Sequence, residues 1–332
     1  MAILPRFLQK NDTVALVCTA RKIDFSLVEN ARKHFESWGF RVIVGESATA
    51  EYFQYSGDDA LRTKDFQTQL DDPNVKAIIC LRGGFGTARI IDQLDFSAFV
   101  KHPKWIVGYS DVTVIQNHIL ESFGVASLHG EMALKFPEFG TDETSAPAWE
   151  SLEALKNALF GEFEPLMSRH CEGGTTEAIQ NLDCFASLAM TEESLAMTEK
   201  KGTATGELVG GNLAILCSLL GSKSELNTDG KILFLEDVGE WLYAIDRMMT
   251  TLKRAGKLDN LAGLAVGQFT HLKDDKMAFG KSAYEIIAEH VAEYSYPVIF
   301  DVPAGHCDIN MPLVFGGVYT IEVSETSAKM YM

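Results

Sequence analysis

The stretch KWIVGYSDVTVIQNHILESF, residues 104–123, joins a short apolar run to a longer amphipathic one through a sharp turn. The run 104–107 has the length and the β-branched content of a buried strand. The stretch 111–123 has the period of a helix that buries one face, because apolar residues recur at steps of three and four: Val112, Ile115, Ile119 and Phe123. A strand, a turn and a helix in this order form the repeating unit of a parallel sheet.

The same alternation of short strands and helices extends over the first 140 residues. Helices are predicted at 26–38, where Gly39 ends the pattern, directly after Gly86, and at 111–123. Strands are predicted in the short β-rich runs at 13–18, 41–44, 75–81, 104–107 and 125–128. This order is typical of a parallel sheet covered on both faces, so residues 1–140 are interpreted as a doubly wound α/β domain.

The periodic pattern weakens over residues 141–204, which we interpret as a linker. Turn-forming and acidic residues dominate there, and the hexapeptide SLAMTE at 187–192 recurs at 194–199. Two such copies could form two turns of helix but are too few for a coiled coil, so the repeat is assigned no function.

Regular runs resume at residue 205 and predict a second, smaller α/β domain that extends to residue 332. Its expected helices are 240–255 and 281–294. Its expected strands include KILFLE at 231–236, PVIFDV at 297–302 and the alternating run VYTIEV at 318–323.

Composition narrows the class of protein. A chain of 332 residues with 46% hydrophobic and 23% charged residues can bury a core, which excludes a disordered chain. The formal net charge of −17 repels phosphate backbones, so nucleic acid is not an expected partner. The sequence holds no apolar run of about 18 residues that could span a membrane, and the opening MAILPRFLQKNDTV lacks the apolar core of a secretory signal. We therefore expect a cytoplasmic, enzyme-sized protein with no membrane partner.

The cysteines indicate neither disulfides nor a metal site. The six residues are scattered, without a C-x-x-C pair or the histidine spacing of a zinc site, so reduced thiols and no metal are expected. Cys18 and Cys80 lie in the apolar runs TVALVC and VKAIICL, where a small core residue is the simplest interpretation.

Reactive side chains follow predicted strands in three places, and open α/β sheets build their sites at such strand ends. In the first place, WIVGYSDVT, the turn after the strand exposes Ser110 at the edge of the sheet, beside the start of a helix. The hydrolase elbow has glycine two residues after the serine, whereas this chain has Val112. By itself, the pattern favours a helix N-cap over a nucleophile.

The second place is the glycine-rich segment CLRGGFGTAR, residues 80–89. Its spacing fits neither the G-x-G-x-x-G dinucleotide loop nor a Walker A loop, so no nucleotide cofactor is expected. Closely spaced glycines let backbone N–H groups approach an anion. The segment is therefore either a cradle for an oxyanion or a carboxylate, or only a tight turn.

The third place combines the stretches LFLEDVGE and VPAGHCDIN. Glu236 follows a buried apolar run and needs a partner to stay ionised. Asp237 and Glu240 are competing carboxylates, interpreted as a cap and as a solvated helix start. His306 follows a strand in a loop, where a packing role or a local hydrogen bond to Asp308 is the alternative to catalysis. Together with Ser110, these residues offer the nucleophile, base and orienting acid that acyl transfer requires.

Several stretches of the chain, in this order, resemble the LD-carboxypeptidase family of serine peptidases, which includes muramoyltetrapeptide carboxypeptidase and the microcin C self-immunity peptidase. They are LRGGFGTARIIDQLD, WIVGYSDVTVI, GELVGGNLAIL, KILFLEDVGEWLYAIDRM and VPAGHCDIN. The resemblance covers about residues 13–323. It implies a Rossmann-like N-terminal domain, a smaller α/β C-terminal domain and a homodimer.

The resemblance also implies the catalytic residues. Carried onto matching positions, the nucleophile is Ser110 on the N-terminal domain. The orienting carboxylate is Glu236 and the base is His306, both on the C-terminal domain. The catalytic triad would therefore depend on the docking of the two domains.

Substrate-binding groups follow from the same resemblance. The oxyanion donors would be the backbone N–H groups of Asp111 and of the Gly83–Gly84 turn. The helix N-terminus after the serine, or Arg89, would hold the substrate carboxylate. Glu131 in LHGEM stands where we expect proline, and a carboxylate at the rim of the substrate site could alter specificity.

These residues predict a hydrolase without a cofactor that cuts the amide between an L-configured centre and a terminal D-amino acid, as in murein tetrapeptides. One alternative is an immunity-type peptidase that cleaves a peptidyl-nucleotide amide. Trp241 or Phe85 could then stack on the base, although core packing explains both more simply. An alternative of another class is a non-catalytic binding module, in which the glycine-rich segment holds an anion and Ser110 only caps a helix.

Overall fold

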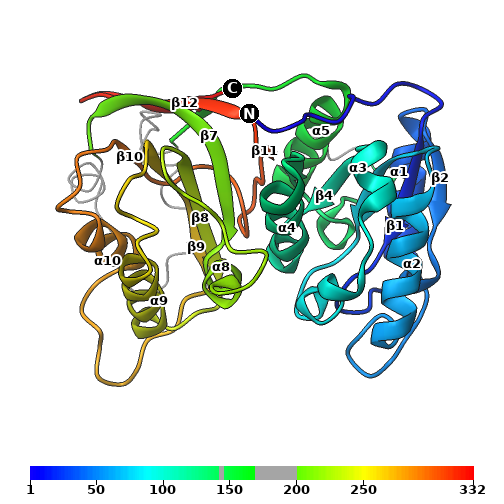
Figure 1. Cartoon of the computed structure of the whole chain (residues 1–332), viewed down its shortest axis with the longest axis horizontal. Helices are drawn as coiled ribbons and strands as arrows, with labels where there is room; N and C mark the ends of the chain where they lie inside the picture. The colour runs from blue at the N-terminus through cyan, green and yellow to red at the C-terminus, as the bar shows by residue number, and fades with distance from the viewer. Residues whose placement is uncertain (142–145, 169–199) are drawn as a thin grey trace. The chain divides into compact units, whose positions relative to one another are not determined.

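The computed structural model describes residues 1–141, 146–168 and 200–332, and its helices and strands form two compact units (Figure 1). The first unit comprises Met1–Phe163, Gly221–Leu226 and Asp308–Gly317, and the second comprises Glu164–Leu220, Asn227–Cys307 and Val318–Met332. The SLAMTE repeat lies outside the described residues. Within those residues, no helix combines the length and the apolar character that crossing a membrane requires.

The first unit is built around a six-stranded sheet. Its strands are β1 (Thr13–Val17), β2 (Arg41–Val44), β3 (Val75–Cys80), β4 (Trp105–Gly108), β5 (Ser127–His129) and β11 (Leu313–Phe315). They follow the order β11-β5-β4-β3-β1-β2, in which only β11 runs antiparallel to its neighbour. The chain leaves β1 for β2 on one side and returns to β3 on the other, so the predicted doubly wound, Rossmann-like fold is confirmed.

Helices connect these strands (Figure 1). They are α1 (Phe25–Ser37), α2 (Asp59–Asp71), α3 (Ser97–Lys101), α4 (Thr113–Phe123) and α5 (Pro147–Phe160). The bounds of α1 and α4 agree with the helices predicted at 26–38 and 111–123. Helix α5 lies in the segment interpreted as a linker, and its apolar face is buried through Leu152, Leu155 and Leu159. It is therefore part of the core of the first unit.

Directly after Gly86 the chain forms two short 3₁₀ turns, Thr87–Arg89 and Ile91–Gln93, rather than the helix predicted there. At the start of the first turn, the side chain of Asp111 accepts the N–H of Thr87 at 2.8 Å. The N–H of Arg89 then bonds to the carbonyl of Gly86 at 3.1 Å, a three-residue step that gives the tighter 3₁₀ turn.

Helix α4 is tied to the strand that precedes it. Gln116 lies off the predicted apolar face, yet it is fully buried. Its side-chain amide donates to the carbonyl of Gly108, the last residue of β4, at 3.0 Å. This hydrogen bond therefore links the strand before the Ser110 turn to the helix after it.

The second unit contains a seven-stranded mixed sheet. Its strands are β6 (Leu166–Met167), β7 (Gly202–Asn212), β8 (Ile232–Val238), β9 (Gly263–Thr270), β10 (Val298–Ile299), β12 (Val318–Val323) and β13 (Ala328–Tyr331), in the order β10-β9-β8-β7-β12-β13-β6. The four strands from β10 to β7 are parallel, and the remaining pairings are antiparallel. The helices are α8 (Leu213–Leu219), α9 (Leu242–Arg254) and α10 (Ala283–His290). The predicted mixed α/β character of this part is confirmed.

Two cysteines belong to the core of the first unit, as the sequence predicts. Cys18 and Cys80 are 1% and 0% exposed. Burial raises the pKa of the Cys80 thiol to about 12, so it stays protonated and unreactive at neutral pH.

Lys104 closes the carboxyl end of α2. The residue is 1% exposed, and its ammonium group donates to the carbonyls of Gln69, Leu70 and Asp72 at 2.8, 3.0 and 2.6 Å. The last carbonyls of a helix lack partners within the helix, and a cation there also favours the helix dipole. Burial lowers the pKa of Lys104 to about 8, which leaves the group mostly charged at neutral pH.

Replacing this lysine should destabilise the protein. Lys104→Met keeps the length of the side chain but leaves three carbonyls, two of them buried, without this donor, so the free energy of unfolding should fall by about 2–3 kcal/mol. Urea denaturation measures the change. Lys101→Met, at an exposed position, is the control and should cost less than about 0.5 kcal/mol. Equal denaturation midpoints for the two variants would contradict this role.

Candidate active site

Ser110 occupies a strained backbone turn at the end of β4. Its φ is 63°, in the left-handed region that residues other than glycine rarely adopt. Holding a residue there costs about 1–3 kcal/mol, and such strain concentrates at functional sites. The caps of the following 3₁₀ turn and of α4 are Tyr109 and Val112, and neither makes a side-chain capping hydrogen bond. The alternative in which Ser110 is a helix N-cap is therefore wrong.

Asp111 ties this turn to the glycine-rich segment. The residue is 1% exposed, and its Oδ2 accepts the N–H of Thr87 at 2.8 Å. Burial raises the pKa of the Asp111 carboxyl above its ordinary value. The hydroxyl of Thr87 donates in turn to Oγ1 of Thr19 at 2.9 Å. A buried polar chain thus joins the segments that follow β1, β3 and β4.

The backbone of Gly83 packs directly against Ser110. A Cβ atom at Gly83 would lie 2.9 Å from Ser110 Cβ and 3.0 Å from Ser110 Oγ, closer than a side chain can approach without displacing its neighbour. Gly84 has a φ of 114°, a conformation that glycine adopts without strain. Steric fit and backbone conformation therefore both require glycine beside the serine hydroxyl.

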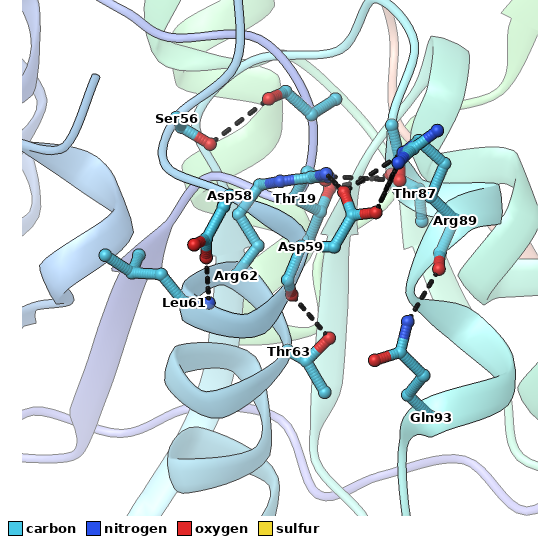
Figure 2. A network of polar contacts seen from close by, with 12 residues as sticks. Thr19, Ser56, Asp58, Asp59, Leu61, Arg62, Thr63, Thr87, Arg89 and Gln93 are labelled. Carbon is cyan, nitrogen blue, oxygen red and sulfur yellow. Dashed lines mark hydrogen bonds and ion pairs between the residues drawn. The ribbon is translucent and has the colours of Figure 1, made fainter. Parts of the chain in front are cut away.

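Charged side chains hold the far end of the glycine-rich segment, as Figure 2 shows. Arg62 of α2 is fully buried and donates to the carbonyls of Thr19 and Gly86, the latter at 3.0 Å. Asp59, one turn earlier in α2, pairs with Arg62 and also with Arg89. The Nε and Nη2 atoms of Arg89 lie 3.0 and 2.6 Å from Asp59 Oδ2. The sequence predicted Arg89 as a ligand of the substrate carboxylate. In the structure its guanidinium group is instead paired with the carboxylate of Asp59.

The second unit brings Glu236 and His306 together. Glu236 lies in β8 and is fully buried, and its Oε2 accepts a hydrogen bond from Nδ1 of His306 at 2.6 Å. The same oxygen accepts the backbone N–H of His306 at 3.2 Å. Thr270, the last residue of β9, donates its hydroxyl to the carbonyl of His306 at 2.7 Å. Both the ring and the backbone of the histidine are therefore held in place.

Two features of the backbone allow this contact. Gly305 has a φ of 103°, and a Cβ atom there would lie 2.6 Å from Glu236 Cγ and 2.7 Å from Oε2. The register between β8 and β9 shifts between Leu235 and Asp237, so Glu236 lies at an irregularity of the pairing where β9 has one residue more than β8. Bulges redirect side chains and are frequent next to active sites.

Asp237, the competing carboxylate, has a different set of partners. It is 2% exposed, and its Oδ1 accepts the amide of Asn212 at 2.9 Å and the N–H of Val238 at 2.8 Å. Its Oδ2 accepts the N–H of Ala214, in the first turn of α8, at 2.9 Å. Asp237 is thus a cap, as predicted, but it caps α8 rather than the helix that follows it in the sequence.

Three aromatic or acidic residues are placed differently from the sequence expectation. Glu131 is 2% exposed and accepts the N–H of Met132 at 2.9 Å, so it is a buried ligand of the backbone rather than a carboxylate at a rim. Trp241 and Phe85 are 38% and 49% exposed, so core packing does not explain them.

Some residues that shape the site are not apparent from the sequence. Arg62 and Asp59 lie on α2, a helix that the apolar pattern does not reveal. Asn212 and Thr270 are the last residues of the strands β7 and β9. A polar residue at the end of an apolar run, the feature that also indicated Glu236, could have pointed to both.

The chain matches known proteins over nearly its whole length. Residues 14–130 match the N-terminal domain of LD-carboxypeptidases, and residues 205–321 match their C-terminal domain. The chain is 32% identical to the probable murein peptide carboxypeptidase of Bacillus subtilis over 325 residues, which cover 98% of this chain and 93% of that protein. It is 26% identical to the murein tetrapeptide carboxypeptidase of Pseudomonas aeruginosa over 316 residues, which cover 93% of this chain and 92% of that protein.

A solved structure shows the same fold. The muramoyltetrapeptide carboxypeptidase from Oxalobacter formigenes aligns with a TM-score of 0.77 at 23% identity, over 96% of this chain and 97% of that chain. The likeness to this structure shows the fold alone, whereas the two matching domains and the 32% identity to the Bacillus protein show the family. The chain belongs to the LD-carboxypeptidase family.

Proposed function

We propose that the protein is a serine-type LD-carboxypeptidase that releases the terminal D-amino acid, D-alanine, from murein tetrapeptides. The observation that carries the proposal is the buried Glu236 carboxylate, bonded to His306 Nδ1 at 2.6 Å. An acid that holds an imidazole in this way forms two members of a catalytic triad, and Ser110 on its strained turn supplies the third. Relatives named for murein peptides support the substrate class.

In the proposed reaction, Ser110 Oγ attacks the carbonyl carbon of the scissile amide, and His306 accepts the hydroxyl proton. Because Nδ1–H bonds to Glu236, the neutral ring presents its lone pair at Nε2. The same proton then passes to the leaving nitrogen, which releases the D-amino acid and leaves an ester on Ser110. A water molecule, deprotonated by His306, hydrolyses the ester and restores the serine. The mechanism requires the two units to dock so that Ser110 and His306 come within proton-transfer distance.

Backbone N–H groups are the proposed donors to the oxyanion of the tetrahedral intermediate. The close approach of Gly83 to Ser110 Oγ supports the Gly83–Gly84 turn as one source, and the N–H of Asp111 is the other. Each donor that is fixed in place before the reaction is worth about 3 kcal/mol in the transition state. The bond between Asp111 and Thr87 holds both segments, so it preserves their spacing.

Glu236, and not the adjacent Asp237, is proposed as the orienting acid. Asp237 already accepts N–H groups from Asn212, Ala214 and Val238. Burial and the neighbouring charge of Glu236 raise the pKa of Asp237 to about 7. A carboxyl group that is partly protonated at neutral pH and occupied by a helix end is poorly suited to stabilise an imidazolium.

A second candidate keeps the catalytic residues and changes the leaving group to a peptidyl-nucleotide amide. The observation that favours it is the half-exposed ring of Phe85, which follows Gly84 in the glycine-rich segment. An exposed aromatic ring can stack on a nucleobase.

A homodimeric assembly and a cytoplasmic location, both expected from the sequence, belong to the main proposal.

The purified protein should release D-alanine from L-Ala-γ-D-Glu-meso-diaminopimelyl-D-Ala, and Ser110→Ala should reduce this turnover by about 10⁴-fold or more, because no acyl-enzyme can form. D-Alanine is quantified enzymatically, and the thermal midpoint of the variant, expected to be unchanged, shows that it folds. Substantial turnover by the variant would refute the nucleophile assignment. Faster cleavage of a peptidyl-nucleotide amide than of the tetrapeptide would favour the second candidate.

Glu236→Gln should lower kcat by about 10³- to 10⁴-fold, because the neutral amide neither fixes the tautomer of His306 nor stabilises its protonated form. Asp237→Asn is the matched control, since it removes the adjacent carboxylate, and its effect on kcat should be much smaller. Steady-state kinetics on the tetrapeptide compare the two. A larger loss in Asp237→Asn would mean that the wrong carboxylate is assigned.

Asp237 should also make stability depend on pH. Its pKa is about 7 in the folded chain and near its ordinary value of 3.8 when unfolded, so the folded state binds more protons between these values. Its contribution to stability is therefore complete below about pH 4 and is lost as the pH rises through 7. In Asp237→Asn the free energy of unfolding should fall less steeply from pH 5 to 7, by up to about 1.4 kcal/mol per pH unit.

Urea titrations at several pH values measure this slope. Asp275→Asn, at an exposed position of the same unit, should leave the slope unchanged. If Asp237→Asn and the wild type have parallel profiles, the carboxyl is not held protonated by burial.

A further inference from the structure

Arg21 stands at a place in the sheet where ligands bind. The strands β1, β3 and β4 are neighbours, and Arg21, the Gly83–Gly84 turn and Ser110 follow their carboxyl ends. The winding of the sheet reverses between β1 and β3. In open α/β sheets, ligands bind outside the carboxyl ends of the strands at such a switch point.

The side chain of Arg21 lies along Gly84. A Cβ atom at Gly84 would come within 2.6 Å of both Cγ and Cδ of Arg21 and within 3.0 Å of its Nε. The backbone is fixed as well, because the N–H of Arg21 donates to the carbonyl of Gly83 at 3.4 Å and Arg21 forms an antiparallel bridge with Tyr55. Since Gly83 packs against Ser110, Arg21 lies one residue further from the serine along the same segment.

The arginines on the other side of the glycine-rich segment are committed to Asp59. Figure 2 shows Arg62 and Arg89 converging on this one carboxylate, with Arg62 also bound to backbone carbonyls. Both guanidinium groups also lie over the ring of Tyr55, at 5.0 and 6.0 Å from its centre. Recruiting Arg89 to a substrate would require breaking its pair with Asp59.

The cations next to Arg21 have partners as well. Arg82 donates to the carbonyl of Lys22 at 2.6 Å, and the ammonium group of Lys22 pairs with Glu51 at 2.7 Å. Arg21 itself is exposed, and within residues 1–141, 146–168 and 200–332 it forms no ion pair. The guanidinium group of Arg21 is therefore exposed beside the glycine-rich segment, whereas Arg82, which forms no ion pair in the described residues either, is half-buried and already donates to a backbone carbonyl.

We propose that Arg21 binds the C-terminal carboxylate of the substrate, the role that the sequence suggested for Arg89. This inference rests on the proposed function, because it concerns the orientation of a peptide whose scissile carbonyl lies at Ser110. The carboxylate of a terminal residue follows the scissile bond by one residue, a span of about 3.8 Å. Ser110 packs against Gly83 and the stem of Arg21 against Gly84, so the serine and the arginine contact consecutive residues of the same segment.

The chemistry of the group fits this role. A guanidinium group presents a planar fork of N–H donors that matches the two oxygens of a carboxylate, and it stays charged at all relevant pH values. The side chain of Arg21 is held along its stem by Gly84, so less rotamer freedom is lost on binding. A site that recognises this charge accepts a substrate only when one residue follows the scissile bond, which is the property of a carboxypeptidase.

The test compares two substrates and four variants. The substrates are the tetrapeptide with a free D-alanine carboxylate and the same peptide ending in D-alaninamide. The wild type should prefer the free acid. Arg21→Ala should lower kcat/KM for the acid by about 10- to 100-fold, mainly through KM, and leave the amide nearly unchanged, because only the charged pair is lost. Arg21→Lys should restore part of the preference.

Lys22→Ala and Arg89→Ala are the controls, and both should keep the preference for the acid. The inference is overturned if Arg21→Ala keeps the preference of the wild type, if it slows both substrates equally, or if Arg89→Ala is the variant that loses the preference. A wild type that cleaves neither peptide would instead refute the proposed function itself, so the two failures are distinguishable.

Discussion

The hydrogen bond between the imidazole of His306 and the carboxylate of Glu236 is the interaction on which the site depends. A fully buried carboxylate is costly unless hydrogen bonds compensate for the lost water, and here one oxygen accepts both the ring N–H and the backbone N–H of the histidine. Each residue depends on the other: the histidine supplies the hydrogen bonds that the buried acid needs, and the acid decides which ring nitrogen carries the proton. Thr270, the register shift between β8 and β9, and Gly305 all help to position the two residues of this contact.

Two glycines of the site, Gly83 and Gly305, are required because other side chains approach their backbones closely, rather than because the chain must be flexible there. At Gly83 and at Gly305 the missing Cβ is the space that Ser110 and Glu236 occupy. The strain at Ser110 persists because its neighbours are tied from several directions, by Gln116 to the end of β4 and by Asp111 to the glycine-rich segment. A rigid surrounding of this kind keeps a reactive side chain in a single orientation.

The strands were the most predictable part of the fold, because strands buried on both faces read as short apolar runs, as in β1 and β3. Helix α2 shows why the rest was harder to predict. Its buried residues include Arg62 and Asp65, whose burial depends on hydrogen bonds to distant segments and leaves no apolar period. Strand β11 pairs with β5 although more than half of the chain lies between them, and no local pattern reports such a pairing.

The sequence by itself determined the alternation of strands and helices, the positions of Ser110, Glu236 and His306 after apolar runs, and the family. Only the tertiary structure decided which carboxylate meets the histidine and which arginine is available to a substrate. Successive side chains of a strand point to opposite faces, so the choice between Glu236 and Asp237 depends on what packs on each face. Likewise, the sequence shows which residues are charged, but whether Asp59 pairs with an arginine depends on contacts between distant segments of the chain.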